Sequence, residues 1–189
     1  MANGPYASID IFVKEFIQLL ADDEYSFNFA IIEKPLETTP QATAVADTDD
    51  RGDLVGMIAL SEANDEDRSV VIGHVHVFPS HRGRGVGTAA GRLLLTYALN
   101  QPHLGGLGLH RVEWHASTKN EASIALARKL GFGTIGIVRY ERLLKAGKTR
   151  GKIGNGLPSP PGSDPDDLFR DLVMFALDWD AWPANKVSS

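Results

Sequence analysis

Apolar residues recur along the chain with two different periods, and these periods predict where the helices and strands lie. Residues 9–21 place apolar side chains on one helical face, and Ser8 is suited to cap that helix. Helical spacing returns from residue 86 to about 100 and from 120 to 130. Apolar runs predict strands over residues 26–32, 53–60, 70–78, 109–116, 134–144 and 168–178. This order of elements predicts an α/β fold with a mixed central sheet and helices on its faces.

The segments between these elements also carry information. Pro79 and Ser80 close the strand over residues 70–78. The helix that follows should bury one apolar face, made of Val86, Ala89, Ala90, Leu93, Leu94 and Tyr97. Residues 61–68 form an acidic connection. We expect flexible loops over residues 33–51 and 145–167, because proline, glycine and polar residues dominate both segments.

Composition narrows the class of protein. The 189 residues suit one domain spanning residues 1–189, and their 43% hydrophobic content is ordinary for a globular protein. The sequence has no apolar run long enough to span a membrane, and no cysteine for a disulfide or a thiolate metal site. A net charge of −5 argues against a nucleic-acid binder, whose surface would be basic. A cytoplasmic protein with no membrane or nucleic-acid partner is the simplest expectation.

The segment Arg82–Thr88 lies between a predicted strand and a predicted helix. At such a turn, backbone N–H groups and the helix dipole favour an anion, and glycine lets a phosphate approach closely. A dinucleotide fingerprint would need glycine or alanine at Thr88, and a Walker loop would need a Gly-Lys-Ser/Thr ending. The spacing that is present is Arg-x-x-Gly-x-Gly, which favours another phosphate-bearing ligand. The alternative is a glycine turn that binds nothing.

A second part of the chain carries three further motifs. They are His-Arg-Val-Glu in the strand at 110–113, Asn-x-x-Ser at 120–123 and Lys-Leu-Gly-Phe at 129–132. Together with the glycine turn, in this order and separation, they resemble the GNAT acyltransferase superfamily, and most of all its RimJ/RimL-like branch. The resemblance implies a single-domain GNAT fold with a mostly antiparallel sheet and helices on both faces. It also implies acetyl-CoA as co-substrate, without a metal.

The N-terminus departs from the family pattern. Members of the family have a further strand and a short helix before the segment that corresponds to residues 9–21, and only a few residues stand there in this chain. That piece lines the acceptor groove in relatives, so the resemblance does not identify the acceptor. Edge strands of this fold often pair between subunits, and a homodimer is therefore a further expectation.

The resemblance assigns the acetyl-CoA site residue by residue. Backbone N–H groups near Val77 and Phe78 should polarise the thioester carbonyl. Arg82 and Arg84 should contact the pyrophosphate with their side chains. Backbone contacts to the pyrophosphate should come from Gly83, Gly85, Val86, Gly87 and Thr88.

Asn120 and Ser123 have two interpretations. The resemblance implies that Asn120 binds the pantetheine arm and that Ser123 lies near the sulfur. Both residues are also ordinary at a helix start, where they would only cap the helix. Many members of the family protonate the departing thiolate with a tyrosine, and Ala127 stands at the matching position. Ser123 is therefore the expected proton donor.

The general base has several candidates. His74 and His76 stand two residues apart on one strand and should share a face, and Glu113 lies on the neighbouring strand. A histidine accepts a proton at neutral pH without special tuning, whereas a buried glutamate would need a raised pKa. We favour His74 or Glu113 over His76, with a water relay or purely structural histidines as the alternatives.

These observations predict an N-acetyltransferase that moves an acetyl group from acetyl-CoA to a primary amine in a ternary complex. The acceptor would be a small molecule or a protein N-terminus. The alternative is a catalytically silent domain that binds acyl-CoA as a sensor or scaffold. The loop Lys145–Asp167 is expected to flank the acceptor, and its acidic end (Asp164, Asp166 and Asp167) to pair with a cationic amine or only with water.

Overall fold

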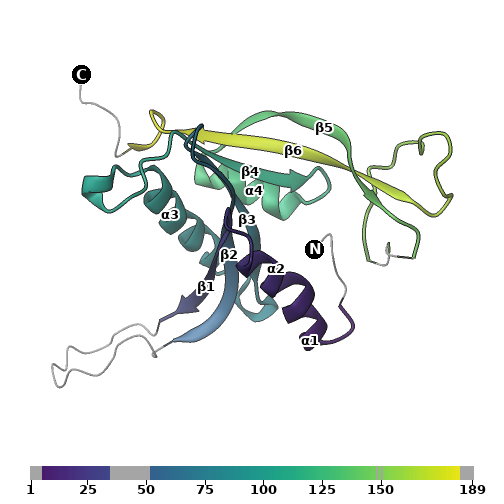
Figure 1. Ribbon diagram of the computed structural model, residues 1–189, viewed down its shortest axis with the longest axis horizontal. Coiled ribbons are helices and arrows are strands. Elements are labelled where there is room, and N and C mark those ends of the chain that lie inside the picture. The colour runs from purple at the N-terminus through teal and green to yellow at the C-terminus, as the bar shows by residue number, and fades with distance from the viewer. Residues whose placement is uncertain (1–5, 35–51, 148, 150, 184–189) are drawn as a thin grey trace.

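The computed structural model describes residues 6–34, 52–147, 149 and 151–183. Most of the loop expected over residues 33–51 lies outside this part, and so do Lys148 and Arg150 of the second loop. Six described strands form one sheet in the order β1-β2-β3-β4-β6-β5 (Figure 1). Helices flank this sheet, which confirms the predicted α/β class.

The elements follow the predicted order. The helices are α1 (Ile9–Phe12), α2 (Gln18–Ala21), α3 (Val86–Leu99) and α4 (Glu121–Leu130), and a π-helical turn over Val13–Ile17 joins α1 to α2. The strands are β1 (Phe27–Glu33), β2 (Asp53–Asn64), β3 (Ser69–Val77), β4 (Arg111–Ser117), β5 (Gly133–Leu144) and β6 (Leu168–Asp178). Ser8 caps the first helix, because its hydroxyl accepts a hydrogen bond from the Ile11 N–H at 3.3 Å.

Strand β2 runs four residues beyond its predicted end at Leu60. The predicted acidic connection is thus partly strand, and the turn to β3 is short. Asn64 holds this turn by accepting from the Asp67 N–H at 2.9 Å and donating to the Asp67 carboxylate at 3.0 Å. The acidic composition therefore marks the solvent-exposed end of a hairpin rather than a long loop.

The centre of the sheet opens between β3 and β4. These two strands are parallel, and they pair only from Ser69 with Arg111 to Ile72 with Trp114. All other neighbouring strands in the described part are antiparallel. Beyond Ile72 the two halves of the sheet diverge, with β1, β2 and β3 in one half and β4, β5 and β6 in the other (Figure 1).

Helices α3 and α4 cover one face of the sheet and close the core. The largest fully buried core side chains include Trp114, Phe175, Ile72, Leu95 and Leu99. The buried face of α3 differs from the predicted one, since Leu93 and Tyr97 are 72% and 42% exposed. Its buried residues are Ala90, Gly91, Leu94, Leu95, Ala98 and Leu99. The helix is rotated because Gly91 faces α4, where a Cβ would lie 2.6 Å from a methyl of Leu130.

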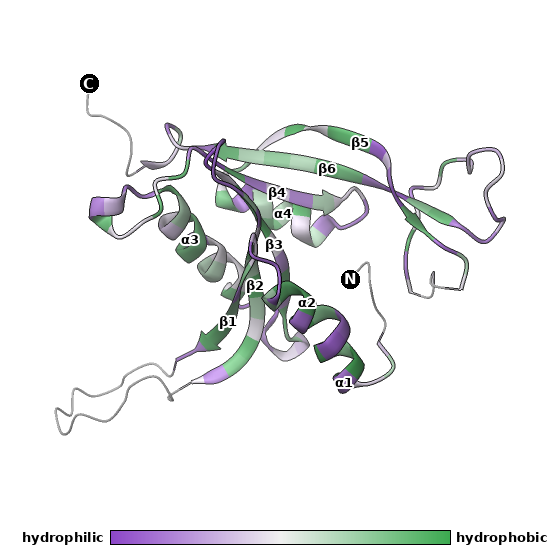
Figure 2. Ribbon diagram, viewed as in Figure 1, coloured by the Kyte–Doolittle hydropathy of each residue, from purple (hydrophilic) through white to green (hydrophobic). Residues whose placement is uncertain are grey.

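The first helix lies across the diverging strands from α3 (Figure 1). Its buried residue Phe16 packs edge-on against the His74 ring, with ring centroids 5.2 Å apart. On the other half, β5 and β6 form a long arm, and both strands become hydrophilic where they cross near its end (Figure 2). The first helix and this arm therefore flank the opening between β3 and β4.

Candidate active site

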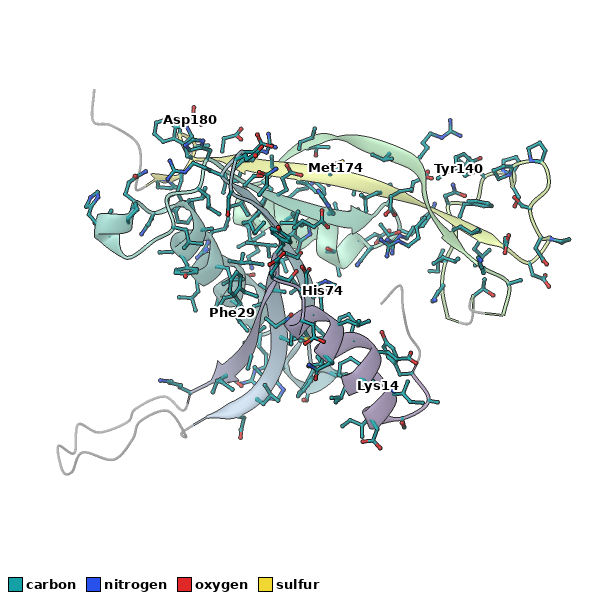
Figure 3. All side chains as sticks on the ribbon, viewed as in Figure 1. Lys14, Phe29, His74, Tyr140, Met174 and Asp180 are labelled. Atoms are coloured by element: carbon teal, nitrogen blue, oxygen red, sulfur yellow. The ribbon has the colours of Figure 1, made fainter. Side chains whose placement is uncertain are left out.

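A bulge in β3 places His74 at the opening of the sheet. Met57 and Ala59 of β2 pair with His76 and Gly73, so β3 carries one extra residue here. His74 takes a φ of 51°, which is uncommon for a residue with a Cβ. The sequence predicted a shared face for His74 and His76 from the regular alternation of side chains along a strand. The bulge interrupts that alternation. His74 lies between the two halves of the sheet (Figure 3).

Two cavities meet at this opening. The glycine-loop cavity has a volume of about 550 Å³, and Val77, Arg82, Gly87 and Ser123 are among its lining residues. The β5–β6 cavity has a volume of about 500 Å³ and lies against the arm, where its lining includes Lys119, Lys152 and Arg170. The residues that line both cavities are Gly73, His74, His115, Asn120 and Arg142. A ligand in one cavity can therefore reach a ligand in the other beside these side chains.

The glycine turn before α3 has the geometry of an anion site. Gly83 and Gly85 have φ angles of 75° and 86°, and a Cβ built on either would meet nothing within 4 Å. Gly85 caps α3 without a side-chain hydrogen bond, so the first N–H groups of the helix have no acceptor within it. These donors belong to Val86, Gly87 and Thr88. The turn thus fits the pyrophosphate that the resemblance implies.

The two arginines of the turn differ in their surroundings. Arg82 lines the glycine-loop cavity, and its Nε donates to the Val77 carbonyl at 2.9 Å, which leaves its terminal nitrogens for a ligand. Arg84 instead forms an ion pair with Glu33 at the end of β1, with 3.0 Å between nitrogen and oxygen. Glu33 also lies 3.5 Å from His81. Arg84 is therefore held at the rim of the turn, away from the cavity.

Val77 and Phe78 differ in the availability of their N–H groups. The Phe78 N–H donates to the Val55 carbonyl at 2.8 Å, so it is not available to a ligand. Successive N–H groups of a strand point to opposite sides, and that of Val77 therefore points away from β2 toward the opening. Of the two N–H groups expected to polarise the thioester carbonyl, only that of Val77 is therefore available, and Val77 also lines the glycine-loop cavity.

Asn120 and Ser123 stand at the start of α4, where both also serve the fold. The Asn120 side-chain oxygen accepts from the Ser123 N–H at 3.2 Å, as expected for a helix cap. The Ser123 hydroxyl oxygen accepts from the Trp114 indole N–H at 2.9 Å. That bond occupies a lone pair and leaves the hydroxyl hydrogen free to be donated. Since both residues line the glycine-loop cavity, their capping role does not exclude contact with a ligand there.

Glu113 lies beside a histidine that the sequence analysis did not name as a candidate base. Its carboxylate lies 2.9 Å from Arg111 and 3.0 Å from the Nε2 of His115. The described residues that line the two cavities include His115 in both cases and Glu113 in neither. The i, i+2 spacing on one strand places Glu113 and His115 on the same face, but it does not show that the two side chains are in contact.

The surroundings of the two histidines of β3 lower their pKa values and so favour the neutral form. Desolvation lowers the pKa of His74 below its usual range, and Glu62 opposes this shift. Desolvation, followed by the charge of Arg82, lowers the pKa of His76. Neutral imidazole is the form that accepts a proton.

The loop over Lys145–Asp167 is tied to the end of the arm. Asn155 donates to the Phe169 carbonyl at 2.6 Å from its backbone and to the Asp171 carboxylate at 2.8 Å from its side chain. Asp164 and Asp167 accept hydrogen bonds from backbone N–H groups of the loop itself. These two carboxylates therefore help to fix the loop, and the pairing of its acidic end with an amine stays a prediction. Gly151, Lys152 and Ile153 of the loop line the β5–β6 cavity.

Two further features concern metals and membranes. Within the described residues, no group of three or more histidine, aspartate or glutamate side chains is arranged to hold a metal ion. None of the described helices combines the length and the apolar character needed to cross a membrane.

Comparison with known proteins agrees with this geometry. A family model described as the Acetyltransferase (GNAT) family matches residues 9–132. The chain is 32% identical over 136 residues to "Putative ribosomal N-acetyltransferase YdaF" of Bacillus subtilis (strain 168). That match covers 71% of this chain, and the chain spans only 59% of the length of that relative.

Solved structures show the same fold. A GCN5-related N-acetyltransferase from Brucella melitensis matches with a TM-score of 0.66 and 21% identity, over 98% of this chain and 65% of that one. A mutant of the spermidine N-acetyltransferase SpeG from Vibrio cholerae matches with a TM-score of 0.58 and 18% identity, over 95% of this chain and 80% of that one. With the family model matching most of its length, the chain belongs to the GNAT family of acetyltransferases.

Proposed function

We propose that the protein is an N-acetyltransferase that moves the acetyl group of acetyl-CoA to a primary amine within a ternary complex. The observation that carries this proposal is the meeting of two cavities where β3 and β4 diverge. One cavity begins at a glycine turn suited to pyrophosphate, and the other is open to a second substrate. An acyl group can therefore pass from one to the other without a covalent enzyme intermediate.

Acetyl-CoA supplies the acyl group as a thioester, and the residues of the chain would handle the protons and the carbonyl. The Val77 N–H would donate to the carbonyl oxygen as negative charge develops on it. The amine nitrogen attacks the carbonyl carbon, its bond to carbon forms, and the carbon–sulfur bond breaks. The amine loses one proton in this step and the thiolate gains one.

The pair of Glu113 and His115 is our proposed base. Glu113 accepts from the Nε2 of His115 at 3.0 Å, which leaves Nδ1 as the nitrogen able to take the proton of the amine. Glu113 also stabilises the imidazolium that forms, as a carboxylate does in a catalytic triad. His74, on the opposite side of the opening, is the second candidate. Ser123 is the proposed donor to the thiolate.

The family and the site say less about the identity of the acceptor than about the type of reaction. The name of the Bacillus relative makes the N-terminus of a ribosomal protein one candidate acceptor. The proposals of a homodimer and of a cytoplasmic location rest on the sequence alone. A dimer would agree with the exposed apolar side chains of the edge strand β5, where Ile135 and Ile137 are 58% and 61% exposed.

Turnover of acetyl-CoA with a panel of amines tests the proposal. The panel should contain peptides with varied N-termini, amino acids, polyamines and aminoglycosides, with release of free CoA as the signal. We expect release with at least one acceptor, and intersecting initial-velocity patterns that indicate a ternary complex. Binding of acetyl-CoA without release from any acceptor would instead support the sensor alternative.

A further inference from the structure

The β5–β6 cavity has the opposite charge balance from the whole chain. The chain has a formal net charge of −5. The lining of this cavity contains four basic side chains and two carboxylates, namely Lys119, Arg142, Lys152 and Arg170 with Glu62 and Glu141. Since the proposed function assigns the glycine-loop cavity to acetyl-CoA, this basic surface faces the second substrate.

Two arginines lie side by side in this cavity with only one carboxylate between them. Arg142 of β5 and Arg170 of β6 are direct cross-strand partners, and like charges in such a pair are destabilising. Glu141 lies 3.3 Å from each guanidinium and neutralises only one of the two charges. Both strands are hydrophilic where they cross near the end of the arm (Figure 2).

Arg170 also has an unused donor. Its Nε is buried and has no hydrogen-bond partner among the described residues. A buried N–H without an acceptor is unfavourable, and native proteins rarely leave one unpaired. A ligand carboxylate at the exposed part of the guanidinium would balance the remaining positive charge, and a small movement of the side chain toward the cavity would let it accept from this N–H as well.

The register of the sheet sets how far this site lies from the proposed base. His115 pairs with Met174, and Ser117 pairs with Leu172. Arg170 lies four residues from Met174, which corresponds to a separation on the order of 13 Å along the strand. The carboxylate of a free α-amino acid is too close to its amine to span this distance. About three extended residues would span it.

We infer that the acceptor is an extended primary amine that carries a carboxylate remote from its reacting nitrogen, bound by Arg170 and Arg142. This inference rests on the proposed function and specifies its second substrate. A peptide with an acidic residue close after its N-terminus has this chemistry, and so does an ω-amino acid. A polyamine does not, because the basic lining repels its second charge. The spermidine enzyme in the comparison shares the fold alone.

Matched acceptors test this inference on the full chain with acetyl-CoA. One set consists of C-terminally amidated tetrapeptides that differ only by Glu, Gln or Lys at the third position, so that no terminal carboxylate can replace the side chain. The other set pairs aminoundecanoate with undecanediamine, whose chains are long enough to span the distance to the arginines. We expect kcat/KM to fall from Glu to Gln to Lys, by at least about tenfold between the extremes, through KM rather than kcat. The relative rates of the two sets show whether the natural acceptor is a peptide or a small molecule.

Variants of the two arginines test whether these side chains cause the preference for an acidic acceptor. Arg170→Gln should remove the preference for Glu over Gln while leaving acetyl-CoA affinity unchanged. Arg128→Gln, at an exposed arginine in the last turn of α4, should retain the preference. If Arg170→Gln fails to fold in a melting experiment, Arg142→Gln tests the preference for Glu over Gln, since the Arg142 side chain is exposed. Unchanged acetyl-CoA affinity is not required of this second variant, because Arg142 also lines the glycine-loop cavity.

The outcomes separate this inference from the proposed function. Release of CoA with Lys peptides or undecanediamine at rates equal to or above those of the acidic acceptors would overturn the inference and leave the acetyltransferase in place. A preference for Glu that survives in both arginine variants would also overturn it. Release of no CoA from any acceptor, despite binding of acetyl-CoA, would overturn the proposed function itself.

Discussion

At the scale of single residues, the assignment of the base depends on one hydrogen bond. His115→Ala should lower kcat by about 10²–10⁴-fold, the range typical of acid–base groups, with little change in acetyl-CoA affinity. Glu113→Gln should cause a smaller loss, because the glutamine oxygen still accepts from Nε2 but no longer stabilises the imidazolium. Steady-state kinetics with His103→Ala, at an exposed histidine far from the site, as the control would measure both effects. An unchanged kcat in His115→Ala with a loss in a His74 variant would transfer the role to His74.

Ser123 combines a structural and a chemical role, so its removal should have two effects. Ser123→Ala leaves the buried indole N–H of Trp114 without its acceptor, which costs about 1–3 kcal/mol of stability. If the hydroxyl also protonates the thiolate, kcat falls in addition. Ser123→Thr keeps the hydroxyl and is the matched control. A lowered melting temperature with an unchanged kcat in Ser123→Ala would leave Ser123 with the structural role only.

His74 links stability to pH. Its pKa is lower in the folded chain than its ordinary value of 6.5, so the unfolded chain binds more protons as the pH falls through this region. The free energy of unfolding should therefore be highest above pH 6.5 and should decrease as the pH falls toward the folded pKa. His74→Asn suits the test because asparagine tolerates a positive φ. Denaturant titrations at several pH values should show a weaker dependence in this variant, and an unchanged dependence would count against desolvation of His74.

At the scale of elements, the sequence predicted where the helices and strands lie better than it predicted which of their faces are buried. Period and turn residues placed the α-helices and strands within a few residues, because burial on one side produces a visible pattern. The short 3-10 helices at Pro79–His81 and Pro102–Leu104 were not predicted. The apolar face of α3 was wrong in part, since Gly91 packs closely against Leu130 and a glycine carries no hydropathy signal. The bulge at His74 was missed for a similar reason. Nothing in the alternation of β3 marks the extra residue, which depends on its pairing with β2.

The glycine turn is the element on which acetyl-CoA binding should depend. Gly87 faces the glycine-loop cavity, where a Cβ would lie 3.3 Å from a methyl of Leu126, a side chain able to move slightly. Gly87→Glu should therefore leave the fold intact while its carboxylate occupies the cavity and repels phosphate. Calorimetry should show loss of acetyl-CoA binding. Ala89→Glu adds the same charge at an exposed position of the same helix and should still bind. Equal affinity in both variants would remove the phosphate role from the turn.

At the scale of the whole molecule, the acetyl-CoA site was predicted from short motifs, whereas the only prediction about the acceptor side was that the loop Lys145–Asp167 flanks it. The glycine turn and the Asn-x-x-Ser start lie within single segments, so their spacing is visible in the sequence. The β5–β6 cavity instead joins residues from β2, β3, β4, β5, β6 and the loop after β5, which only the folded sheet brings together. The partnership of Arg142 and Arg170 likewise depends on the register between two strands that are 23 residues apart at their nearest ends.

The loop Lys145–Asp167 should adjust the acceptor site from outside the sheet. Asn155 fastens it to Asp171, whose pKa is lowered chiefly by that hydrogen bond and by the Tyr140 N–H. Asn155→Ala would release the loop without shortening it, while a linker in place of residues 151–163 would remove the part that lines the cavity. Because the glycine turn lies beyond the opening of the sheet, acetyl-CoA affinity should stay the same in both variants. Acceptor KM should rise moderately in the first and more strongly in the second. Acceptor kinetics that survive both changes would place specificity entirely on the strands.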